Sequence, residues 1–360
     1  MRTELYARQN ANYRYGGMRI ACPWPLAELG EPDEAASDRP LIKIYETDAE
    51  QVASSTIGVL DPVGGLGRTD MSSVFKLCDG FRILYPGQAD FLIHEDGRSI
   101  GVCRASGIST ETSNHLLLDQ VLPRVLAHLG RLVVHAGAVR VGDKAIAFLG
   151  ESGSGKSTLT AAFQQQGNIP LSDDALVVDA DSASIGILPT YPSLRLWPDS
   201  IEVVFDRTPR LAAMDDNLSK RRVKLDNDAP DPDEPVPLAA IFVLRQTEAS
   251  EGDGALITPL SPRESCMAII GNSFRLEFSD RERSSRLFSN CGRIADRVPT
   301  YMLSCPRDYG ILPAVVSADI PHMTGVGAPD WAISACRATL DAGRGAKDAR
   351  HEPRRLAASP

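Results

Sequence analysis

Closely spaced cysteines are absent from this sequence. Because zinc sites and redox-active dithiols need cysteines a few residues apart, this absence excludes both of those site types. An odd number of scattered thiols is typical of a protein in a reducing compartment. The histidines are equally isolated: His94, His115 and His128 form no metal-ligand spacing, and we expect ordinary surface or half-buried side chains. The seven cysteines are Cys22, Cys78, Cys103, Cys266, Cys291, Cys305 and Cys336.

An excess of positive charge and long apolar runs are also missing. The chain has 38 Lys and Arg against 47 Asp and Glu, a net charge of −9. Surfaces that bind nucleic acid normally carry a basic excess, so we expect no nucleic-acid partner. The first ten residues contain no apolar signal-peptide core, and no apolar run approaches the length of a membrane span. These absences predict a cytoplasmic protein with no membrane partner.

What is present fits a two-domain α/β protein. The chain of 360 residues is long enough for two cores, and 43% apolar with 24% charged residues is ordinary for a globular protein. We predict a β-rich N-terminal domain over residues 1–112, a catalytic domain over 113–325 and a C-terminal helix or disordered tail over 326–360. Turns are expected at Asp79-Gly80, Pro86-Gly87 and Asp96-Gly97. The strands predicted around them are Tyr15–Cys22, Leu41–Tyr45, Ser73–Leu77, Phe81–Tyr85, Asp90–His94 and Ser99–Cys103.

A glycine-rich loop follows the apolar run 145–149, which is typical of a buried strand. The loop satisfies the P-loop pattern G-x-x-x-x-G-K-[ST], and a helix is predicted after it. Glycines let backbone N–H groups curl around a polyanion, toward which the helix presents its positive end. Lys156 supplies a cation for the β- and γ-phosphates, and Ser157 a ligand for Mg²⁺. We therefore predict binding of ATP with Mg²⁺, and GTP or pyrophosphate stay open as donors. The predicted binding residues are Gly150, Glu151, Ser152, Gly153, Ser154, Gly155, Lys156, Ser157 and Thr158.

Two adjacent carboxylates, Asp173 and Asp174, follow a short apolar segment, and we expect them at a strand end beside the P-loop. Adjacent side chains point in different directions, so one can face a metal ion while the other faces an acceptor hydroxyl. We assign Asp173 to Mg²⁺ together with Ser157, and a solvated turn is the alternative. His135 either helps to hold the γ-phosphate or to orient the base, or it is a strand histidine bonded to a backbone carbonyl.

The layout around these residues is unusual for a P-loop protein. Residues 114–129 have helical spacing in which Pro123 predicts a kink or two consecutive helices. A β-hairpin then leads into the P-loop, where most P-loop proteins have a helix and then a strand. Residues 135–139 (HAGAV), 150–157 (GESGSGKS) and 172–174 (SDD) together resemble the C-terminal catalytic domain of HPr kinase/phosphorylase. The layout looks most like the kinases of that type found beside ribosomal peptide clusters, such as those for lasso peptides.

That resemblance covers about residues 115–320 and implies an α/β fold of the HPr kinase/PEP carboxykinase type. The implied P-loop kinase domain has a mixed sheet entered by a β-hairpin, and residues 13–20 look like the β-rich leader domain of the peptide-tailoring branch. The resemblance implies Asp174 as the catalytic base, with His135 and Lys156 beside it. The bifunctional members imply a hexamer, and here a homo-oligomer stays open. Where those members have a Glu-x-Arg-Gly segment, this chain has Leu194–Trp197 (LRLW). The second metal ligand is therefore unassigned, and we do not expect phosphorolysis.

Beyond Asp174, the sequence predicts further elements and two charged segments. Arg195 either reaches a phosphate or points outward. The basic stretch Ser219–Lys224 either binds phosphate or an acidic peptide, or is a solvated loop. The acidic, proline-rich stretch Asp226–Pro237 predicts a mobile segment. The predicted strands are Leu176–Asp179, Leu238–Leu244 and Pro299–Leu303, and the predicted helices are Ser261–Ser273, with a capping box, and Ser284–Ala295.

Three functions are compatible with these motifs. The leading hypothesis is ATP- and Mg²⁺-dependent phosphoryl transfer to a serine or threonine hydroxyl of a peptide or small protein, with a biosynthetic precursor peptide as the favoured acceptor. A nucleotide-responsive binding protein with little turnover is the second. A small-molecule kinase, for instance one acting on free serine, is the third, and acceptor screening separates it from the first.

Overall fold

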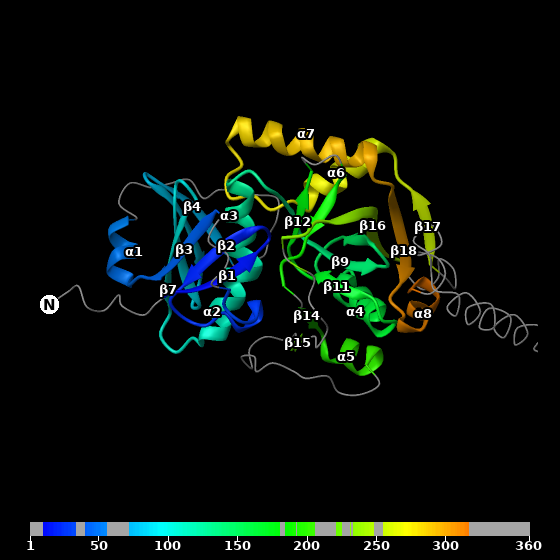
Figure 1. The fold of residues 1–360 in the computed structure, drawn as a ribbon, viewed down its shortest axis with the longest axis horizontal. Coiled ribbons are helices and arrows are strands. Elements are labelled where there is room, and N and C mark those ends of the chain that lie inside the picture. Colours follow the sequence, from blue (N-terminus) through cyan, green and yellow to red (C-terminus); the bar gives the residue numbers. More distant parts are fainter. Residues whose placement is uncertain are drawn as a thin grey trace, which may run out of the picture. The chain divides into compact units, whose positions relative to one another are not determined.

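The chain adopts a mixed α/β structure built on two large sheets (Figure 1). The computed structural model describes residues 10–33, 40–55, 72–180, 184–191, 193–205, 221–224, 231, 233–247 and 255–316. The described residues up to Arg307 belong to one compact unit, and the described residues 308–316 belong to another. The boundaries expected at residues 112 and 325 stay predictions, and the expected tail 326–360 lies outside the described residues.

The first sheet has seven strands in the order β1-β2-β3-β7-β6-β5-β4. Strand β3 pairs in parallel with β2 and β7, and every other pair in this sheet is antiparallel. The three predicted turns are confirmed, because each joins two consecutive antiparallel strands. The strands are β1 (Ala11–Tyr15), β2 (Met18–Cys22), β3 (Leu41–Glu46), β4 (Ser73–Leu77), β5 (Gly80–Tyr85), β6 (Ala89–His94) and β7 (Ser99–Arg104), with helix η1 (Ala27–Leu29) after β2 and helix α1 (Ala49–Ser55) after β3.

One predicted strand of this sheet is wrong. The sequence predicts a single strand over Tyr15–Cys22, but this segment contains the turn of the β1–β2 hairpin. Gly16 and Gly17 have φ of 55° and 77°, the left-handed region that glycine enters without steric cost. This two-residue turn reverses the chain, so Tyr15 pairs with Met18.

A helical segment with a π turn connects the two sheets. Helix α2 (Thr110–Leu116) leads into the π turn η2 (Leu117–Val121) and then into α3 (Leu122–His128). Pro123 explains the π turn, because it has no N–H to donate to the carbonyl of Asp119 four residues earlier. The N–H of Leu122 instead bonds the carbonyl of Leu117, five residues back. The predicted break is confirmed, and it lies just before the proline.

The second sheet is mixed and has β10, β16 and β18 in parallel at its centre. Its strand order is β11-β9-β10-β16-β13-β12-β8, with β18 beside β16 and β17 beside β18. The predicted hairpin is present, since β9 and β10 pair antiparallel. The strands are β8 (Leu132–Val134), β9 (Ala136–Val141), β10 (Lys144–Leu149), β11 (Ile169–Ser172), β12 (Leu176–Asp179), β13 (Gly186–Leu188), β16 (Val236–Thr247), β17 (Leu256–Pro259) and β18 (Thr300–Pro306), and β14 (Ser193–Leu196) pairs separately with β15 (Arg221–Lys224).

The helices of the second half begin at polar caps. Ser261 and Glu264 form the predicted capping box of α6 (Pro262–Gly271). Helix α7 (Arg281–Arg297) begins earlier than predicted, because the Asp280 carboxylate accepts the N–H of Arg283. Among the described residues, no helix combines the length and apolar character that crossing a membrane requires. The remaining helices are α4 (Lys156–Gln165), α5 (Pro198–Val204), η3 (Tyr309–Ile311) and α8 (Leu312–Ala314).

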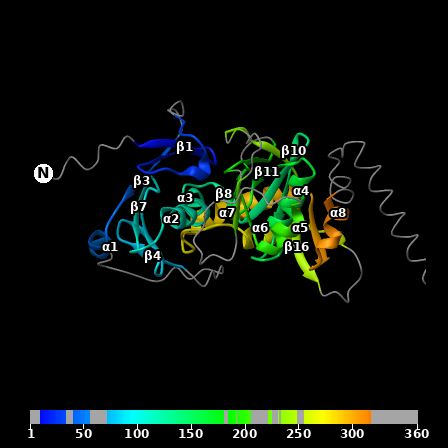
Figure 2. The ribbon, with the colours of Figure 1, turned by 90° about the horizontal axis from the view of Figure 1, so that it is seen from below.

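The two sheets share part of one hydrophobic core. A single cluster joins apolar side chains of the first sheet to those of α2–α3 and to Val133, Val177 and Leu188 of the second sheet. A second cluster lies between the second sheet and helices α6 and α7. Figure 2 turns the ribbon by 90° and labels α2 and α3, which contribute to the first cluster, α6 and α7, which contribute to the second, and β8, which contributes to both.

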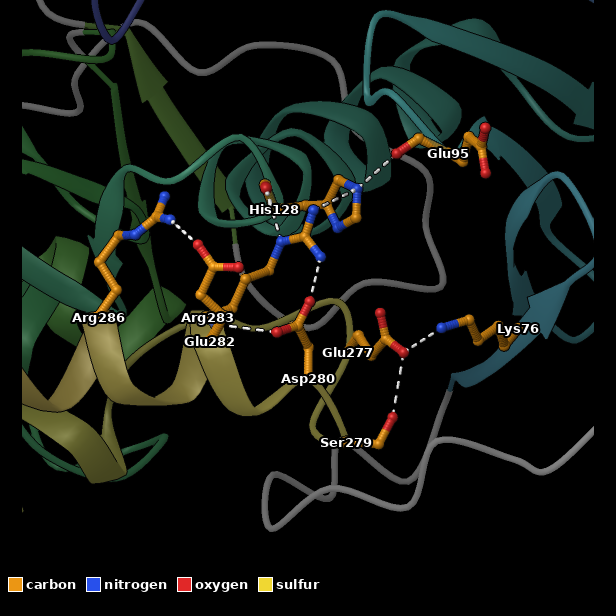
Figure 3. Close-up of polar contacts among 9 residues, drawn as sticks. All are labelled: Lys76, Glu95, His128, Glu277, Ser279, Asp280, Glu282, Arg283 and Arg286. Atoms are coloured by element: carbon orange, nitrogen blue, oxygen red, sulfur yellow. Dashed lines mark hydrogen bonds and ion pairs between the residues drawn. The ribbon is translucent and has the colours of Figure 1, made fainter.

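Polar contacts add to this packing where the first sheet meets the segment before α7 (Figure 3). Lys76 of β4 forms an ion pair with Glu277. His128 at the end of α3 bonds the carbonyl of Glu95 at 2.7 Å, and the Arg283 side chain donates to the carbonyl of His128 at 3.1 Å. The contacts link β4, the β6–β7 turn, α3 and α7, which are far apart in the sequence.

Candidate active site

The glycine-rich segment 150–157, which carries the P-loop sequence pattern and is called the P-loop below, lies between β10 and α4. Gly150 follows the strand where a side chain would not fit: a Cβ there would lie 2.8 Å from Ser154 Oγ and 3.0 Å from the carbonyl oxygen of Leu244. Gly155 has φ of 100° and forms the N-cap of α4, a conformation that favours glycine. The loop is further held by Gln246 of β16, whose Nε2 donates to the carbonyl of Gly153 at 2.9 Å.

Lys156 folds back over this loop. Its side-chain Nζ donates to the carbonyls of Gly150 at 2.7 Å and Glu151 at 3.0 Å, and the residue is only 5% exposed. The Ser154 hydroxyl is buried and has no hydrogen-bond partner among the described residues. Carbonyl oxygens are weaker partners for an ammonium group than phosphate oxygens are. A bound polyphosphate would therefore compete well for Lys156.

Strand register brings the P-loop, His135 and the Asp pair to one edge of the second sheet. Strand β9 runs antiparallel to both β10 and β11, so β10 and β11 run in the same direction. Leu149 at the end of β10 lies opposite Ala136, and Ser172 at the end of β11 lies opposite Ala138. The residues that follow β10 and β11 are therefore about 10 Å apart, two strand spacings. His135, directly before β9, lies at the same edge.

His135 is tied to the backbone on both sides of this edge. The ring Nδ1 of His135 lies 2.9 Å from the carbonyl oxygen of Asp174, and the backbone N–H of His135 donates to the carbonyl of Asn272 at 2.7 Å. The ring also meets Phe274 edge-on, with centroids 6.1 Å apart. The bond to a backbone carbonyl is the contact that the second interpretation of His135 expects. Because that carbonyl belongs to Asp174, the same contact also fixes the main chain of the proposed base.

The two carboxylates of the Asp pair bond to different parts of Arg195. The backbone N–H of Arg195 donates to Asp173 Oδ2 at 2.7 Å, and the guanidinium Nη1 lies 3.5 Å from Asp174 Oδ2. Asp173 is buried, whereas the Asp174 side chain is 14% exposed. The Arg195 side chain is also only 14% exposed, so the outward orientation considered from the sequence is wrong.

Two further members of this cluster, Asp119 and His115, were not predicted from the sequence. Asp119 of the π turn is fully buried, and its Oδ2 lies 4.0 Å from the Arg195 guanidinium and 2.5 Å from His115 Nδ1. Both side chains are buried, so the expectation of a surface or half-buried His115 is wrong. The available signal was a His and an Asp four residues apart on the predicted helix 114–129.

Tyr15 packs next to Asp119 and joins the first sheet to this cluster. Its hydroxyl donates to the carbonyl of Leu118 at 2.7 Å, and its ring lies 6.2 Å from that of Tyr191. Burial raises the pKa of Tyr15 well above its usual value, and the charges of Asp119 and Asp174 raise it further. Tyr15 is therefore a neutral hydrogen-bond donor, with no role as an acid or base near neutral pH.

The donor set at this edge fits a magnesium ion that arrives with a nucleotide. Within the described part of the chain, no group of three or more His, Cys, Asp or Glu side chains is placed to hold a metal ion. Magnesium in phosphoryl-transfer sites is typically held by one or two carboxylates together with substrate phosphates. Ser157 in the first turn of α4 and Asp173 after β11 offer one hydroxyl and one carboxylate. These two residues stay a prediction.

Comparisons with known proteins add little to this description. No protein-family model and no curated protein matches the chain. Among solved structures, it is similar to one described as the Hpr(Ser) kinase/phosphatase from Coxiella burnetii, with a TM-score of 0.28 and 8% sequence identity. That similarity covers 53% of this chain and 95% of the other. A match of this strength carries no argument about the site.

Proposed function

We propose that the chain is a kinase that transfers the γ-phosphoryl group of ATP to a serine or threonine hydroxyl of a peptide or small protein. The observation that supports it is the strand register, which places a P-loop after β10 and an Asp pair after β11 at the same sheet edge. Kinase chemistry needs those two groups at one place, because phosphoryl transfer depends on positioning and on charge stabilisation.

Each residue has a distinct role in this proposal. The P-loop N–H groups and Lys156 bind the phosphates, and Asp174 accepts the proton of the acceptor hydroxyl. The acceptor oxygen forms its bond to the γ-phosphorus as the bond to the β,γ-bridging oxygen breaks, and ADP leaves. Mg²⁺ bound with the nucleotide would spread the phosphate charge, and Ser157 and Asp173 would hold it. His135 keeps the Asp174 main chain at this edge through its bond to the carbonyl.

The direct test is transfer of label from γ-labelled ATP to a panel of synthetic serine and threonine peptides and to free L-serine. We expect labelled peptide with the wild type and at least about a hundredfold less with Asp174→Asn, which is the usual scale for a general base. Labelled GTP and pyrophosphate in parallel reactions identify the donor. Label on free L-serine alone would favour the small-molecule kinase instead.

A matched control for this substitution is Asp90→Asn. Asp90 also pairs with an arginine, since its Oδ1 lies 2.6 Å from Arg82 Nε, but it lies in the first sheet. This variant should label the acceptor as well as the wild type does. Equal labelling by the wild type and Asp174→Asn would show that Asp174 is not the base.

The contact between Asp174 and Arg195 favours one second candidate. An acceptor hydroxyl would have to compete with the Arg195 guanidinium for the Asp174 carboxylate, which suits a nucleotide-responsive binding protein with little turnover. For such a protein we expect tight ATP binding in equilibrium dialysis, no label on any acceptor of the panel, and partner capture that depends on nucleotide.

A further inference from the structure

The Asp119 carboxylate is the buried end of a line of charges that reaches the proposed active site. The line runs from His115 through Asp119 and Arg195 to Asp174, with separations of 2.5, 4.0 and 3.5 Å. It begins in the helical segment between the two sheets and ends at the edge of the second sheet that carries the P-loop. Arg195 is shared, because one nitrogen, Nη1, lies near both carboxylates.

The contacts of Arg195 show why Asp119 matters for its position. The guanidinium Nε is buried and has no hydrogen-bond partner among the described residues. A guanidinium has five N–H donors, and here the donor at Nε is not used. The hydrogen bonds of Arg195 do not by themselves fix the orientation of the guanidinium. The two carboxylates supply the attraction that holds Arg195 between them. Without Asp119, the Arg195 guanidinium would keep Asp174 as its charged partner, and no second carboxylate would hold it in place.

Stability alone does not explain an aspartate at this position. Asp119 has an exposed side-chain fraction of 0%, and the helix around it is lined by buried leucines and valines. Replacing buried ion pairs by apolar residues is often neutral or stabilising, because removing charges from water is costly. The π turn also belongs to this argument, since such turns in helices are frequent at functional sites.

We propose that Asp119 and Arg195 are positioning residues for phosphoryl transfer: Asp119 anchors the Arg195 guanidinium, and Arg195 holds the Asp174 carboxylate through its side chain and Asp173 through its backbone N–H. This inference rests on the proposed kinase function and adds to it. It makes the helical segment between the sheets part of the active site. Neither residue touches the nucleotide in this scheme, so nucleotide affinity should not depend on them.

The test is steady-state phosphoryl transfer from MgATP to a serine or threonine peptide of the panel that the wild type labels, followed as ADP release, in a double-mutant cycle. We expect Asp119→Asn and Arg195→Gln each to lower kcat by about 10- to 100-fold, the loss that a misplacement of about 1 Å produces, while KM and the dissociation constant for ATP stay within about twofold. Because Asp119 acts through Arg195, the double variant should be no slower than Arg195→Gln alone. Independent effects would instead multiply.

Two controls separate this inference from a purely structural role. Arg195→Lys keeps the charge but not the fork-shaped guanidinium. Its kcat should therefore be higher than that of Arg195→Gln when Asp119 is present. When Asp119→Asn is also present, the two Arg195 variants should have the same kcat. Glu282→Gln removes an ion pair with Arg286 on the exposed face of α7 and should leave kcat unchanged. If Asp119→Asn fails to fold, as judged by loss of ATP binding, the two Arg195 variants still decide the question.

The outcomes distinguish this inference from the proposed function. Turnover by the wild type that is lost in Asp174→Asn and kept in Asp119→Asn and Arg195→Gln would overturn the inference alone. Multiplying losses of kcat, or a change in KM only, would overturn it as well. If the wild type releases no ADP, or Asp174→Asn releases it at the wild-type rate, the proposed function falls, and the inference falls with it.

Discussion

The buried imidazole of His128 connects the end of α3 to the first sheet (Figure 3). Its Nε2 lies 2.7 Å from the carbonyl oxygen of Glu95, and because a carbonyl only accepts, Nε2 carries the proton. Nδ1 is buried and has no hydrogen-bond partner among the described residues. Burial lowers the pKa of His128, and the nearby charge of Arg283 lowers it further. The fold therefore favours the neutral ring.

That preference predicts a loss of stability in acid. The unfolded pKa of histidine is about 6.5 and the folded pKa of His128 is lower, so the unfolded chain binds more protons between the two values. The contribution of His128 is complete above about pH 6.5 and is lost as the pH falls below it. We expect the thermal midpoint of His128→Gln to fall less between pH 7 and pH 5.5 than that of the wild type, measured by circular dichroism.

His94 provides the control with the opposite sign. It is exposed, and its bond to Asp96 raises its pKa. Its contribution is therefore present below the unfolded pKa and is lost as the pH rises through the folded pKa. His94→Gln should not reduce the acid loss, and an equal effect of both variants would argue against the role given to His128.

At the scale of elements, the approach of β9 to α4 sets the position of the P-loop helix. Gly137 of β9 faces this helix, and a Cβ there would lie 2.6 Å from Thr160 Oγ1. Thr160 is buried and donates to the carbonyl of Lys156 at 3.0 Å. A side chain at position 137 would therefore push on the first turn of α4, which carries Lys156 and Ser157.

We expect Gly137→Ala to lower the free energy of unfolding by about 1–3 kcal/mol, the usual cost of overpacking, in urea denaturation. Removing the obstructing hydroxyl in Gly137→Ala/Thr160→Ala should recover most of that loss. The matched control is Gly292→Ala on α7, where a Cβ meets no atom within 4 Å. That substitution should stabilise by about 0.5–1 kcal/mol, because alanine is the better helix former. A destabilised Gly292→Ala variant would show that crowding is not the cause at position 137.

Elements with a local signal were the ones that the sequence could predict. Strand β12, the capping box of α6 and the hairpin into the P-loop follow from a short apolar run, a cap and a turn within a few residues. The two adjacent glycines Gly16 and Gly17 are a local turn signal too, but the predicted strand Tyr15–Cys22 included them.

The contact between Asp119 and Arg195 has no local signal of this kind. Asp119 and Arg195 lie on different elements, the π turn η2 and strand β14. Their contact depends on how the helical segment packs on the second sheet. Helical spacing can predict the pair of His115 and Asp119. It says nothing about the contact between Asp119 and Arg195, which are far apart in the sequence.

At the scale of the whole molecule, the burial of the cysteines predicts which thiols a reagent can reach in the folded chain. Cys78 is exposed, whereas Cys22 and Cys291 are fully buried. Burial raises the pKa of each buried thiol to about 12. The reactive thiolate is then about a thousandfold scarcer than for an ordinary cysteine, in addition to being inaccessible.

Labelling with a maleimide, located by peptide mass spectrometry, should modify Cys78 within minutes in native buffer. Cys22 and Cys291 should be modified only above the urea midpoint, and together, because each lies in a core of the same compact unit. Cys78→Ser should remove the fast modification at that peptide and leave the late ones unchanged. Early labelling of Cys22 alone would show that the first sheet opens independently.

The hydrophobic cluster common to both sheets has a consequence for ligand binding. At Gly16 a Cβ would lie 2.7 Å from Val177 Cγ2, so the β1–β2 hairpin is in close contact with the second sheet. A molecule that binds only the folded form lowers the population of every opened form that destroys its site. If ATP binds at the P-loop, deuterium uptake by amides of β5 and β6 should slow by the same factor as uptake by β10, although no nucleotide atom comes near them.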